Sequence, residues 1–233
     1  MAVWVQLAAG SGVRAESAIP KQFRRLGRKP LLAYAIETFL SVFPEAPVVV
    51  VLPLAYFTYG KALLQRYFPK AQLLFTIGGA TRSASTEAAL AFLCEAALLQ
   101  PQEVIAFHDA VRPFPSAALI ARAFATAQQK GSAVCGLPLS FSIRQVEGES
   151  SRALPRESFW EVQTPQVFRG DVLQAAWQKL SPTADPRFTD ESSWIEAAGW
   201  PIYLIPGEPT NIKITYPIDW EVARGWLRRK STS

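Results

Sequence analysis

The chain has 233 residues, of which 49% are hydrophobic and 18% are charged. These proportions exclude a disordered chain, and the length suits one domain with a full core. The net charge of +5 is spread out, apart from the short basic run Arg228-Arg229-Lys230, so it favours a small anionic substrate over a nucleic-acid track.

Three features favour a cytoplasmic protein without a membrane partner. The first residues enter an apolar, strand-like run directly and do not form a secretory signal. No apolar stretch approaches the roughly 20 residues that span a bilayer. Cys94 and Cys135 lie far apart in apolar runs, which predicts buried free thiols and no disulfide or metal site.

Short apolar runs alternate with helix-like stretches along the first 137 residues. Strands are expected at residues 2–8, 48–52, 72–76, 103–107 and 133–137, and helices at residues 31–43, 55–68, 82–99 and 116–130. This alternation predicts an α/β fold with a mostly parallel sheet covered by helices on both faces. Residues 48–52 form an unbroken apolar run, as expected of a parallel strand that is buried on both sides.

The pattern changes after Pro138. Residues 140–165 carry strand-type side chains interrupted by a polar stretch at 147–151, which predicts a hairpin arm at about residues 139–164. The arm is too apolar to remain uncovered, so we expect a partner subunit to contact it.

The chain then returns to the earlier kind of pattern. We expect helices near residues 170–180, 190–198 and 217–229 and strands at residues 202–205 and 211–215. Because there is no internal repeat and no linker, we expect residues 1–233 to form a single domain with the arm as an excursion.

A glycine loop follows the first expected strand. Its sequence Gly10-Ser11-Gly12-Val13-Arg14-Ala15 matches the dinucleotide-binding pattern G-x-G-x-x-G/A. A dinucleotide fold should start a helix at once, yet Pro20 disfavours helix at the residue before it. The second strand should also end in an acidic residue, and here it ends in Leu52-Pro53. These two departures argue against an NAD or FAD enzyme.

The same loop has the features of a triphosphate site. Backbone N–H groups at Gly10 and Gly12 are unobstructed by side chains and can surround an anion. Arg14 and Lys21 add positive charge, which phosphoryl and nucleotidyl transfer need on the phosphorus oxygens. A surface turn with two solvated cations is the alternative, and the loop alone does not decide between them.

A second glycine pair, Gly78-Gly79, follows an expected strand and opens a helix. The glycines allow a ligand to approach the backbone, and Ser85 on the first helical turn is placed to bind a base or phosphate. Ser83 is an alternative explanation of the polar residues here, as the N-cap of the helix.

Asp109 follows the strand expected at residues 103–107, at the edge where α/β sheets bind ligands, so it is placed to meet a substrate hydroxyl or a magnesium ion. Arg112 either contacts a ligand or pairs with a carboxylate such as Asp109. His108 is the only histidine, so we expect it to bond to the backbone and not to a metal. Lys213 either points into the crevice or protects an edge strand.

These motifs form an ordered series along nearly the whole chain. The series is Ala8-Ala9-Gly10-x-Gly12-x-Arg14, Pro20-Lys21-Gln22, Gly78-Gly79-x-x-Arg82-x-x-Ser85, His108-Asp109-Ala110-x-Arg112-Pro113, Thr164-Pro165-Gln166, Thr189-Asp190 and Asn211-Ile212-Lys213-Ile214-Thr215. It resembles the 2-C-methyl-D-erythritol 4-phosphate cytidylyltransferase family. The resemblance implies a Rossmann-like, nucleotide-diphospho-sugar transferase type of fold.

The resemblance also implies the reaction and the roles of single residues. CTP and methylerythritol phosphate would give the CDP-alcohol and diphosphate, with Mg²⁺ held mainly by the CTP phosphates. Arg14 and Lys21 would stabilise the transition state, and Arg156 and Lys213 would hold the substrate phosphate. The expected binding residues are Ala8, Ala9, Gly10, Gly12, Gly79, Ser85 and Ala110 for the nucleotide, Asp109 and Thr164 for the alcohol, and Arg112. The arm would exchange between the two subunits of a homodimer.

Several positions depart from the usual pattern of the family. They are Ala15, Ala80, Thr86, Val111 and Ser142, where methionine, an acidic residue, valine or isoleucine, alanine and threonine are usual. None of these changes removes a charged catalytic group. Ribitol-5-phosphate cytidylyltransferase resembles the chain in most of these motifs and is the alternative function.

Overall fold

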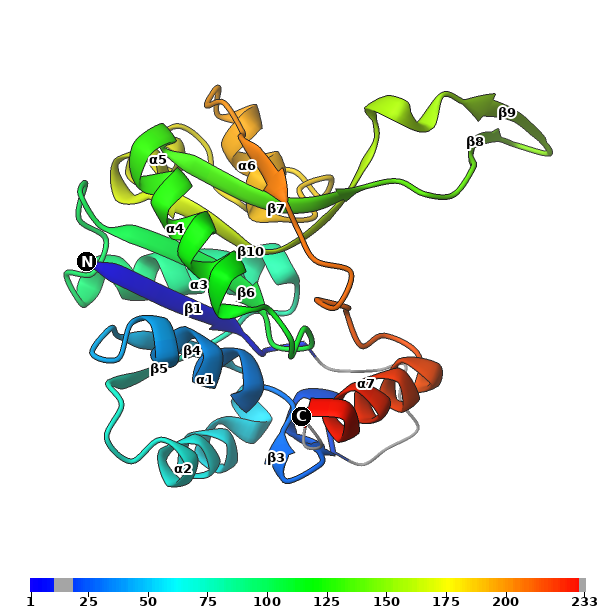
Figure 1. Cartoon of the computed structure of the whole chain (residues 1–233). Coiled ribbons are helices and arrows are strands. Elements are labelled where there is room, and N and C mark those ends of the chain that lie inside the picture. Colours follow the sequence, from blue (N-terminus) through cyan, green and yellow to red (C-terminus); the bar gives the residue numbers. More distant parts are fainter. Residues whose placement is uncertain (11–18, 231–233) are drawn as a thin grey trace.

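A computed structural model describes residues 1–10 and 19–230, with the side chain of residue 230 excepted. Its centre is a seven-stranded sheet in the order β11-β7-β10-β6-β1-β4-β5 (Figure 1). The strands are β1 (Ala2–Leu7), β4 (Val48–Leu52), β5 (Leu73–Ile77), β6 (Val104–Asp109), β7 (Ser132–Pro138), β10 (Trp160–Arg169) and β11 (Leu204–Pro206). Of the pairings in this sheet, only those of β10 with β6 and β7 are antiparallel. The predicted mostly parallel sheet is therefore confirmed.

Helices cover both faces of the sheet, as predicted. They are α1 (Ala33–Val42), α2 (Phe57–Tyr67), α3 (Arg82–Glu95), α4 (Ala117–Lys130), α5 (Gly170–Lys179), α6 (Glu191–Ala197) and α7 (Pro217–Lys230), with short 3-10 turns η1 (Lys21–Phe23), η2 (Leu54–Tyr56) and η3 (Arg156–Ser158). One core cluster joins α1, α2 and α4 to the sheet, and a second joins α3, α5 and α6 to the opposite face. None of the helices described has the length and apolar character needed to cross a bilayer.

The alternation of side chains along the central strands explains the two core clusters. All five residues of β4 are fully buried, and Val48 and Val50 join the first cluster while Val49 and Val51 join the second. In β1, Trp4 packs on the first face and stacks on Phe39 of α1 at 4.9 Å between ring centroids. Burial on both faces is what a central parallel strand requires.

The functional end of the sheet follows from the strand register. Leu7 at the end of β1 pairs with Asp109 at the end of β6 and with Val51 near the end of β4. Because the three strands are parallel, the loops that follow them leave the sheet at the same edge. Ligands of open α/β sheets bind at this edge.

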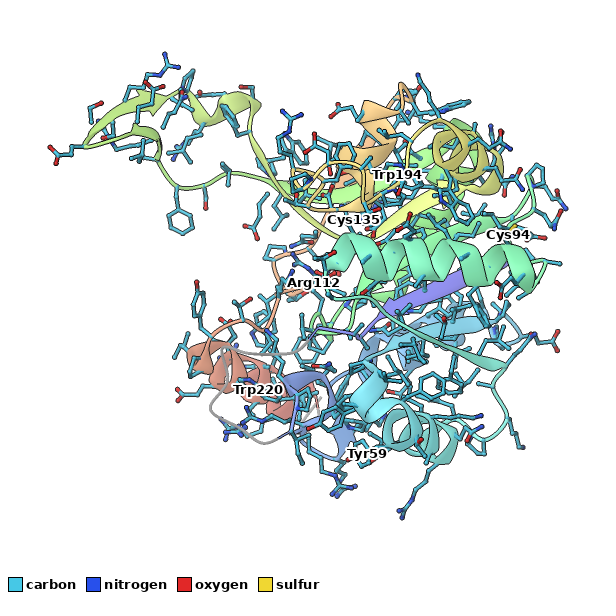
Figure 2. The ribbon with its side chains drawn as sticks, turned by 180° about the vertical axis from the view of Figure 1, so that it is seen from behind. Tyr59, Cys94, Arg112, Cys135, Trp194 and Trp220 are labelled. Carbon is cyan, nitrogen blue, oxygen red and sulfur yellow. The ribbon has the colours of Figure 1, made fainter. Side chains whose placement is uncertain are left out.

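A small layer lies beside this edge. Strands β2 (Arg25–Leu26) and β3 (Lys29–Pro30) form a hairpin that packs against α7 through a third apolar cluster, which includes Leu26, Leu31 and Trp220 (Figure 2). The guanidinium of Arg24 lies 4.7 Å from the centre of the Trp220 ring. The hairpin was not predicted, because two-residue strands have too little pattern to detect. It anchors the C-terminal helix beside the loop that carries Lys21.

The predicted arm is present and extends away from the sheet (Figure 1). Its strands β8 (Ile143–Glu147) and β9 (Ser150–Leu154) pair antiparallel, and Gly148 in the turn has a φ of +60°. The left-handed conformation favours glycine at this position. Two large apolar side chains of the arm, Phe141 and Val146, are 79% and 70% exposed.

Three expectations about local structure were wrong. Residues 211–215 form no strand; this irregular segment crosses the edge of the sheet, and the Ile214 N–H donates to the Val111 carbonyl. The helix expected at residues 82–99 ends at Glu95, where Ala97 has a φ of +55°. Cys94, in the last turn of α3, is therefore exposed, whereas Cys135 in β7 is buried and burial raises the pKa of its thiol to about 12 (Figure 2).

Candidate active site

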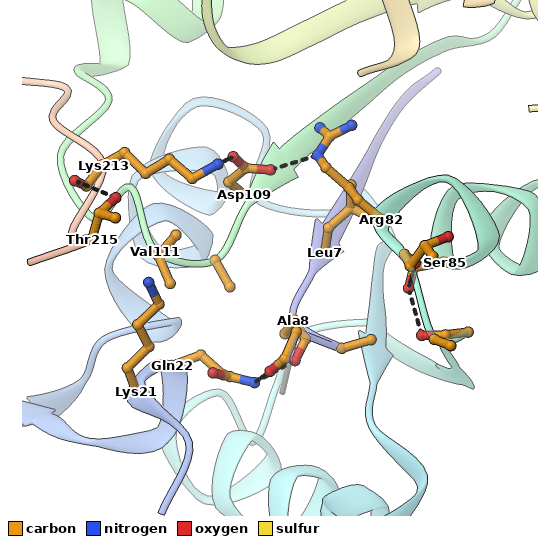
Figure 3. Close-up of a pocket in the computed structure, with 16 residues that line it drawn as sticks. Leu7, Ala8, Lys21, Gln22, Arg82, Ser85, Asp109, Val111, Lys213 and Thr215 are labelled. Atoms are coloured by element: carbon orange, nitrogen blue, oxygen red, sulfur yellow. Dashed lines mark hydrogen bonds and ion pairs between the residues drawn. The ribbon is translucent and has the colours of Figure 1, made fainter. Parts of the chain in front are cut away.

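A cavity of about 410 Å³ opens at the carboxyl ends of β1 and β6 (Figure 3). It is enclosed by the loops after β1, β5 and β6, by η1 and by the segment before α7. Of the predicted site residues, Ala8, Ala9, Gly10, Lys21, Gly79, Ser85, Asp109, Ala110 and Lys213 line it. A second cavity of about 240 Å³ shares Asp109 and Lys213 with the first and is also lined by Arg112 and Thr164.

The glycine pair before α3 lets the walls of the cavity pack closely at this point. A Cβ atom on Gly78 would lie 2.3 Å from the Cβ of Ala9, and one on Gly79 would lie 2.4 Å from the Cβ of Ala84. Any larger residue would push the loops apart. The two glycines are therefore required by close packing of the walls, in addition to any approach of a ligand.

The start of α3 differs from the expectation in one residue. Thr81, not Ser83, is the N-cap, and its side chain accepts the Ala84 N–H at 3.1 Å. Ser83 instead donates to the Phe188 carbonyl. Ser85 is buried and donates to the Thr81 carbonyl at 2.9 Å, so its oxygen keeps lone pairs for a ligand N–H or O–H.

Gln22 organises the loop after β1, although it was not among the predicted site residues. Its buried side-chain amide donates to the Ala8 carbonyl at 2.7 Å and to the Gly10 carbonyl at 2.8 Å. These bonds tie the end of β1 and the start of the following loop to η1. The motif Pro20-Lys21-Gln22 pointed to this position, but only the fold shows which atoms the side chain holds.

Lys21 extends from η1 toward the cavity, and its Nζ donates to the Ile214 carbonyl at 2.9 Å (Figure 3). Residue 214 lies in the segment that also carries Lys213. The two predicted cations thus come from positions 192 residues apart and meet at one cavity because this segment crosses the edge of the sheet. Arg14 and Gly12 lie outside the described residues, so their placement stays a prediction.

Asp109 is held between two cations. Lys213 Nζ lies 2.8 Å from Oδ2, and Arg82 Nε lies 3.1 Å from Oδ1. Burial alone would raise the pKa of Asp109, but Arg82 and Lys213 outweigh burial and hold that pKa well below its usual range. Asp109 therefore stays ionised and accepts hydrogen bonds without releasing a proton.

Arg82 is fixed from its other side by Glu191, the first residue of α6. Glu191 is 1% exposed and accepts from Arg82 Nη1 at 3.0 Å and Nη2 at 2.8 Å. Its Oε1 also accepts from the hydroxyl of Thr86 at 2.6 Å. Burial by itself would lower the pKa of Arg82, yet Glu191 and Asp109 raise it. The departure at position 86 thus adds a hydrogen bond to a buried carboxylate.

Arg112 lines the second cavity and donates to backbone carbonyls beside it. Its Nη1 donates to the Asn211 carbonyl at 2.9 Å, its Nη2 lies 3.4 Å from the Val162 carbonyl, and the side chain of Asn211 in turn donates to the Thr164 carbonyl. The described contacts include no ion pair between Arg112 and Asp109, whose oxygens accept from Arg82 and Lys213. Arg112 secures the backbone around Thr164.

Arg156 lies apart from the other predicted catalytic residues. It is exposed on the arm, where Nη1 donates to the Ser140 carbonyl at 2.6 Å. The arm extends away from the central sheet (Figure 1), and Arg156 is not among the described residues that line either cavity. Within the described part of one chain, the fold brings together Lys21, Lys213 and Asp109 but not Arg156.

A comparison with known protein families decides the assignment. The family model for 2-C-methyl-D-erythritol 4-phosphate cytidylyltransferase matches residues 2–229. The chain belongs to this family. The cytidylyltransferase of Bacteroides fragilis is 34% identical over 95% of the chain and 97% of its own length, and that of Acidobacterium capsulatum is 34% identical over the full length of both.

Solved structures of cytidylyltransferases agree with the family assignment. A crystal structure of 2-C-methyl-D-erythritol 4-phosphate cytidylyltransferase from Thermus thermophilus superposes with a TM-score of 0.72 at 33% identity, covering 98% of this chain and all of that chain. A crystal structure of 4-diphosphocytidyl-2C-methyl-D-erythritol synthase superposes with a TM-score of 0.80 at 26% identity, covering 97% and 98% of the two chains.

Proposed function

We propose that this cytidylyltransferase transfers CMP from CTP to 2-C-methyl-D-erythritol 4-phosphate, forming 4-diphosphocytidyl-2-C-methyl-D-erythritol and diphosphate for the non-mevalonate isoprenoid pathway. The gathering of Lys21, Lys213 and Asp109 around one cavity, in a chain of this family, carries the proposal. The names of its relatives favour methylerythritol phosphate over ribitol 5-phosphate as the acceptor.

The described side chains suit a reaction in which the substrates supply the reacting groups. A phosphate oxygen of the acceptor attacks the α-phosphorus of CTP, and the bond between that phosphorus and the bridging oxygen of the leaving diphosphate breaks. The attacking phosphate is already an anion, so no protein base is needed. Lys21 and Arg14 stabilise the charge on the α-phosphate oxygens, and each such contact in a dry site contributes about 3 kcal/mol.

We place the acceptor beside Asp109, which lines both cavities, and Thr164, which lines the second cavity. Lys213 binds the phosphate of the acceptor together with Arg156 from a second subunit. To do so, the flexible side chain of Lys213 exchanges its contact with the Asp109 carboxylate for one with the phosphate. Asp109 and Thr164 bind the hydroxyl groups. Ala8, Ala9, Gly79, Ser85 and Ala110 form the pocket for cytosine and ribose, where their small size leaves room for the ligand.

A magnesium ion is part of this proposal. Both carboxylate oxygens of Asp109 are engaged by cations, and the structure, over the residues it describes, places no three His, Cys, Asp or Glu side chains together as an ion site. We expect the ion to be held mainly by CTP phosphates and water. The ion would neutralise part of the triphosphate charge.

We also propose a homodimer in the cytoplasm. Phe141, Val146 and Phe159 of the arm are 79%, 70% and 40% exposed, and covering them with a second subunit would remove apolar surface from water. The same contact would bring Arg156 of one subunit to the cavity of the other subunit.

One assay tests the proposed function. The purified protein is incubated with CTP and magnesium and with either methylerythritol phosphate or ribitol 5-phosphate, and diphosphate release is measured. We expect a higher kcat/KM for methylerythritol phosphate. Faster turnover of ribitol 5-phosphate would transfer the assignment to the ribitol enzyme, and no CTP-dependent turnover of either alcohol phosphate would refute cytidylyl transfer to this class.

A further inference from the structure

His108 has a side chain whose two nitrogens are both accounted for. It is fully buried in β6, with its ring centroid 4.8 Å from that of Trp4. Nε2 lies 2.8 Å from the carbonyl oxygen of Arg112, and Nδ1 lies 3.2 Å from the hydroxyl oxygen of Thr164. A carbonyl oxygen only accepts hydrogen bonds, so Nε2 carries a hydrogen and donates it.

The protonation state of the His108 ring then determines which way the hydroxyl hydrogen of Thr164 points. Burial lowers the pKa of His108 to about 4, so the ring is neutral at pH 7 and Nδ1 carries no hydrogen. Nδ1 is therefore an acceptor, and the hydroxyl of Thr164 donates to it. The same oxygen accepts the Asp109 N–H at 3.0 Å. A threonine hydroxyl has one hydrogen and two lone pairs, so one lone pair remains for a ligand.

The neighbouring carboxylate of Asp109 is likewise only a hydrogen-bond acceptor. Asp109 is ionised and has no hydrogen to donate. Both groups that the proposed function assigns to the acceptor alcohol thus offer lone pairs only. A ligand hydroxyl can donate to them, whereas a carbonyl or carboxylate oxygen in the same place would meet no hydrogen from either group.

We propose that His108 is a positioning residue that makes Thr164 a hydrogen-bond acceptor, so that this part of the site binds substrate hydroxyl groups as donors. The inference rests on the proposed function, because it assumes that Thr164 and Asp109 contact a polyol phosphate. It assigns a role to the histidine that stands beside Asp109 without making it a catalytic group. The ring orients the hydroxyl, and the hydroxyl contacts the substrate.

Two substitutions separate orientation of Thr164 from support of the backbone. Asn places its Oδ1 the same number of bonds from Cα as Nδ1, so His108→Asn keeps an acceptor for Thr164. Gln places its side-chain N–H at the distance of Nε2, so His108→Gln keeps the bond to the Arg112 carbonyl and loses that acceptor. We expect His108→Gln to raise the KM for methylerythritol phosphate on the order of tenfold, as for a lost hydrogen bond, with the KM for CTP changed less than about twofold.

His108→Asn should stay within about threefold of the unchanged enzyme in both KM values. Thr164→Val should raise the KM for the alcohol phosphate by itself and add little in the His108→Gln background, because both changes remove the same interaction. Unfolding midpoints of all variants identify those that lose activity by failing to fold. Equal effects of the Asn and Gln variants, or additive effects of the double variant, would overturn the inference.

A second measurement does not depend on activity. His108 is the only histidine, so its ring nitrogens give unambiguous ¹⁵N NMR signals in the full protein. We expect a neutral ring with the hydrogen on Nε2 at pH 7; a ring protonated on Nδ1 or on both nitrogens would refute the inference. If the unchanged enzyme does not turn over methylerythritol phosphate, the proposed function is refuted. The NMR signals would still test the orientation of the Thr164 hydroxyl.

Discussion

At the scale of single residues, the site is a set of charges whose partners determine what each can do. Asp109 is held ionised by Arg82 and Lys213, and Arg82 is held in turn by Glu191. Lys21 lines the same cavity and donates to the Ile214 carbonyl. The sequence singled out Asp109, Lys21 and Lys213 and also the motif Thr189-Asp190 beside Glu191, but it assigned no role to Glu191, which lies 82 residues from Asp109.

Lys21→Ala should reduce kcat by about a hundredfold or more, because one charge that stabilises the α-phosphate oxygens is lost. The fold should remain intact, since the side chain projects into a cavity. Steady-state kinetics and a thermal unfolding curve check both points. Lys29→Ala removes a cation of the neighbouring hairpin that pairs with Glu37 outside the cavity, and it should leave kcat unchanged. Near-normal turnover by Lys21→Ala would refute its assigned role.

Thr86→Val keeps the shape of the side chain and removes the donor to Glu191. We expect a loss of about 1 to 2 kcal/mol in the free energy of unfolding, because a buried carboxylate oxygen loses one hydrogen bond. The change in kcat/KM should be small, since Arg82 still holds both oxygens of Glu191. Urea denaturation measures the stability. Thr126→Val, in α4 on the opposite face of the sheet, is the matched control, and an equal loss there would show that the Glu191 bond is not the cause.

At the scale of elements, the arm is the part that a single chain does not explain. The hairpin β8–β9 extends away from the sheet and leaves most of its side chains exposed, and Arg156 follows it in the exposed turn η3. The alternation of strand-type residues predicted the hairpin. The sequence pattern could not predict the direction in which the arm extends. That direction depends on where in the sheet β7 ends and β10 begins.

A mixture of two inactive variants tests whether the arm completes the site of a partner. In a dimer formed from Lys21→Ala and Arg156→Ala subunits, one site would combine an intact Lys21 with an intact Arg156 of the other chain. Random exchange in an equal mixture should therefore restore about a quarter of the activity, as half of the dimers are mixed and each has one complete site. The mixture is assayed after subunit exchange. Activity equal to the mean of the separate variants would contradict the shared site.

At the scale of the whole molecule, the buried neutral His108 links stability to pH. Its pKa lies at about 4 in the folded protein and at about 6.5 when unfolded, so the unfolded chain binds the proton more readily. Stability is thus fully present above pH 6.5 and is lost as pH falls toward 4. We expect the free energy of unfolding to fall by about 2 kcal/mol between pH 7 and pH 5.

Urea denaturation at several pH values measures this slope. Because the chain has one histidine, His108→Asn removes the only imidazole that titrates in this interval. The slope should therefore flatten in the variant, and an unchanged slope would show that other groups cause it.

The sequence by itself determined the parts of this protein that depend on neighbouring residues. Apolar runs and helical spacing defined the central strands and most helices, because burial of a strand or of a helix face imposes a local period. The ordered motifs singled out Lys21, Ser85, Asp109 and Lys213, which the structure brings to one cavity.

Only the tertiary structure decided the contacts between distant residues. Asn211 to Thr215 has the alternation of a strand but lies irregularly over the sheet edge, because the Ile214 N–H bonds to the loop after β6. Glu191 and Gln22 gained their roles from side chains and carbonyls that no local pattern places beside them. A local pattern records which face of an element is buried, but the partner across a cavity is set by how the whole sheet brings its loops together.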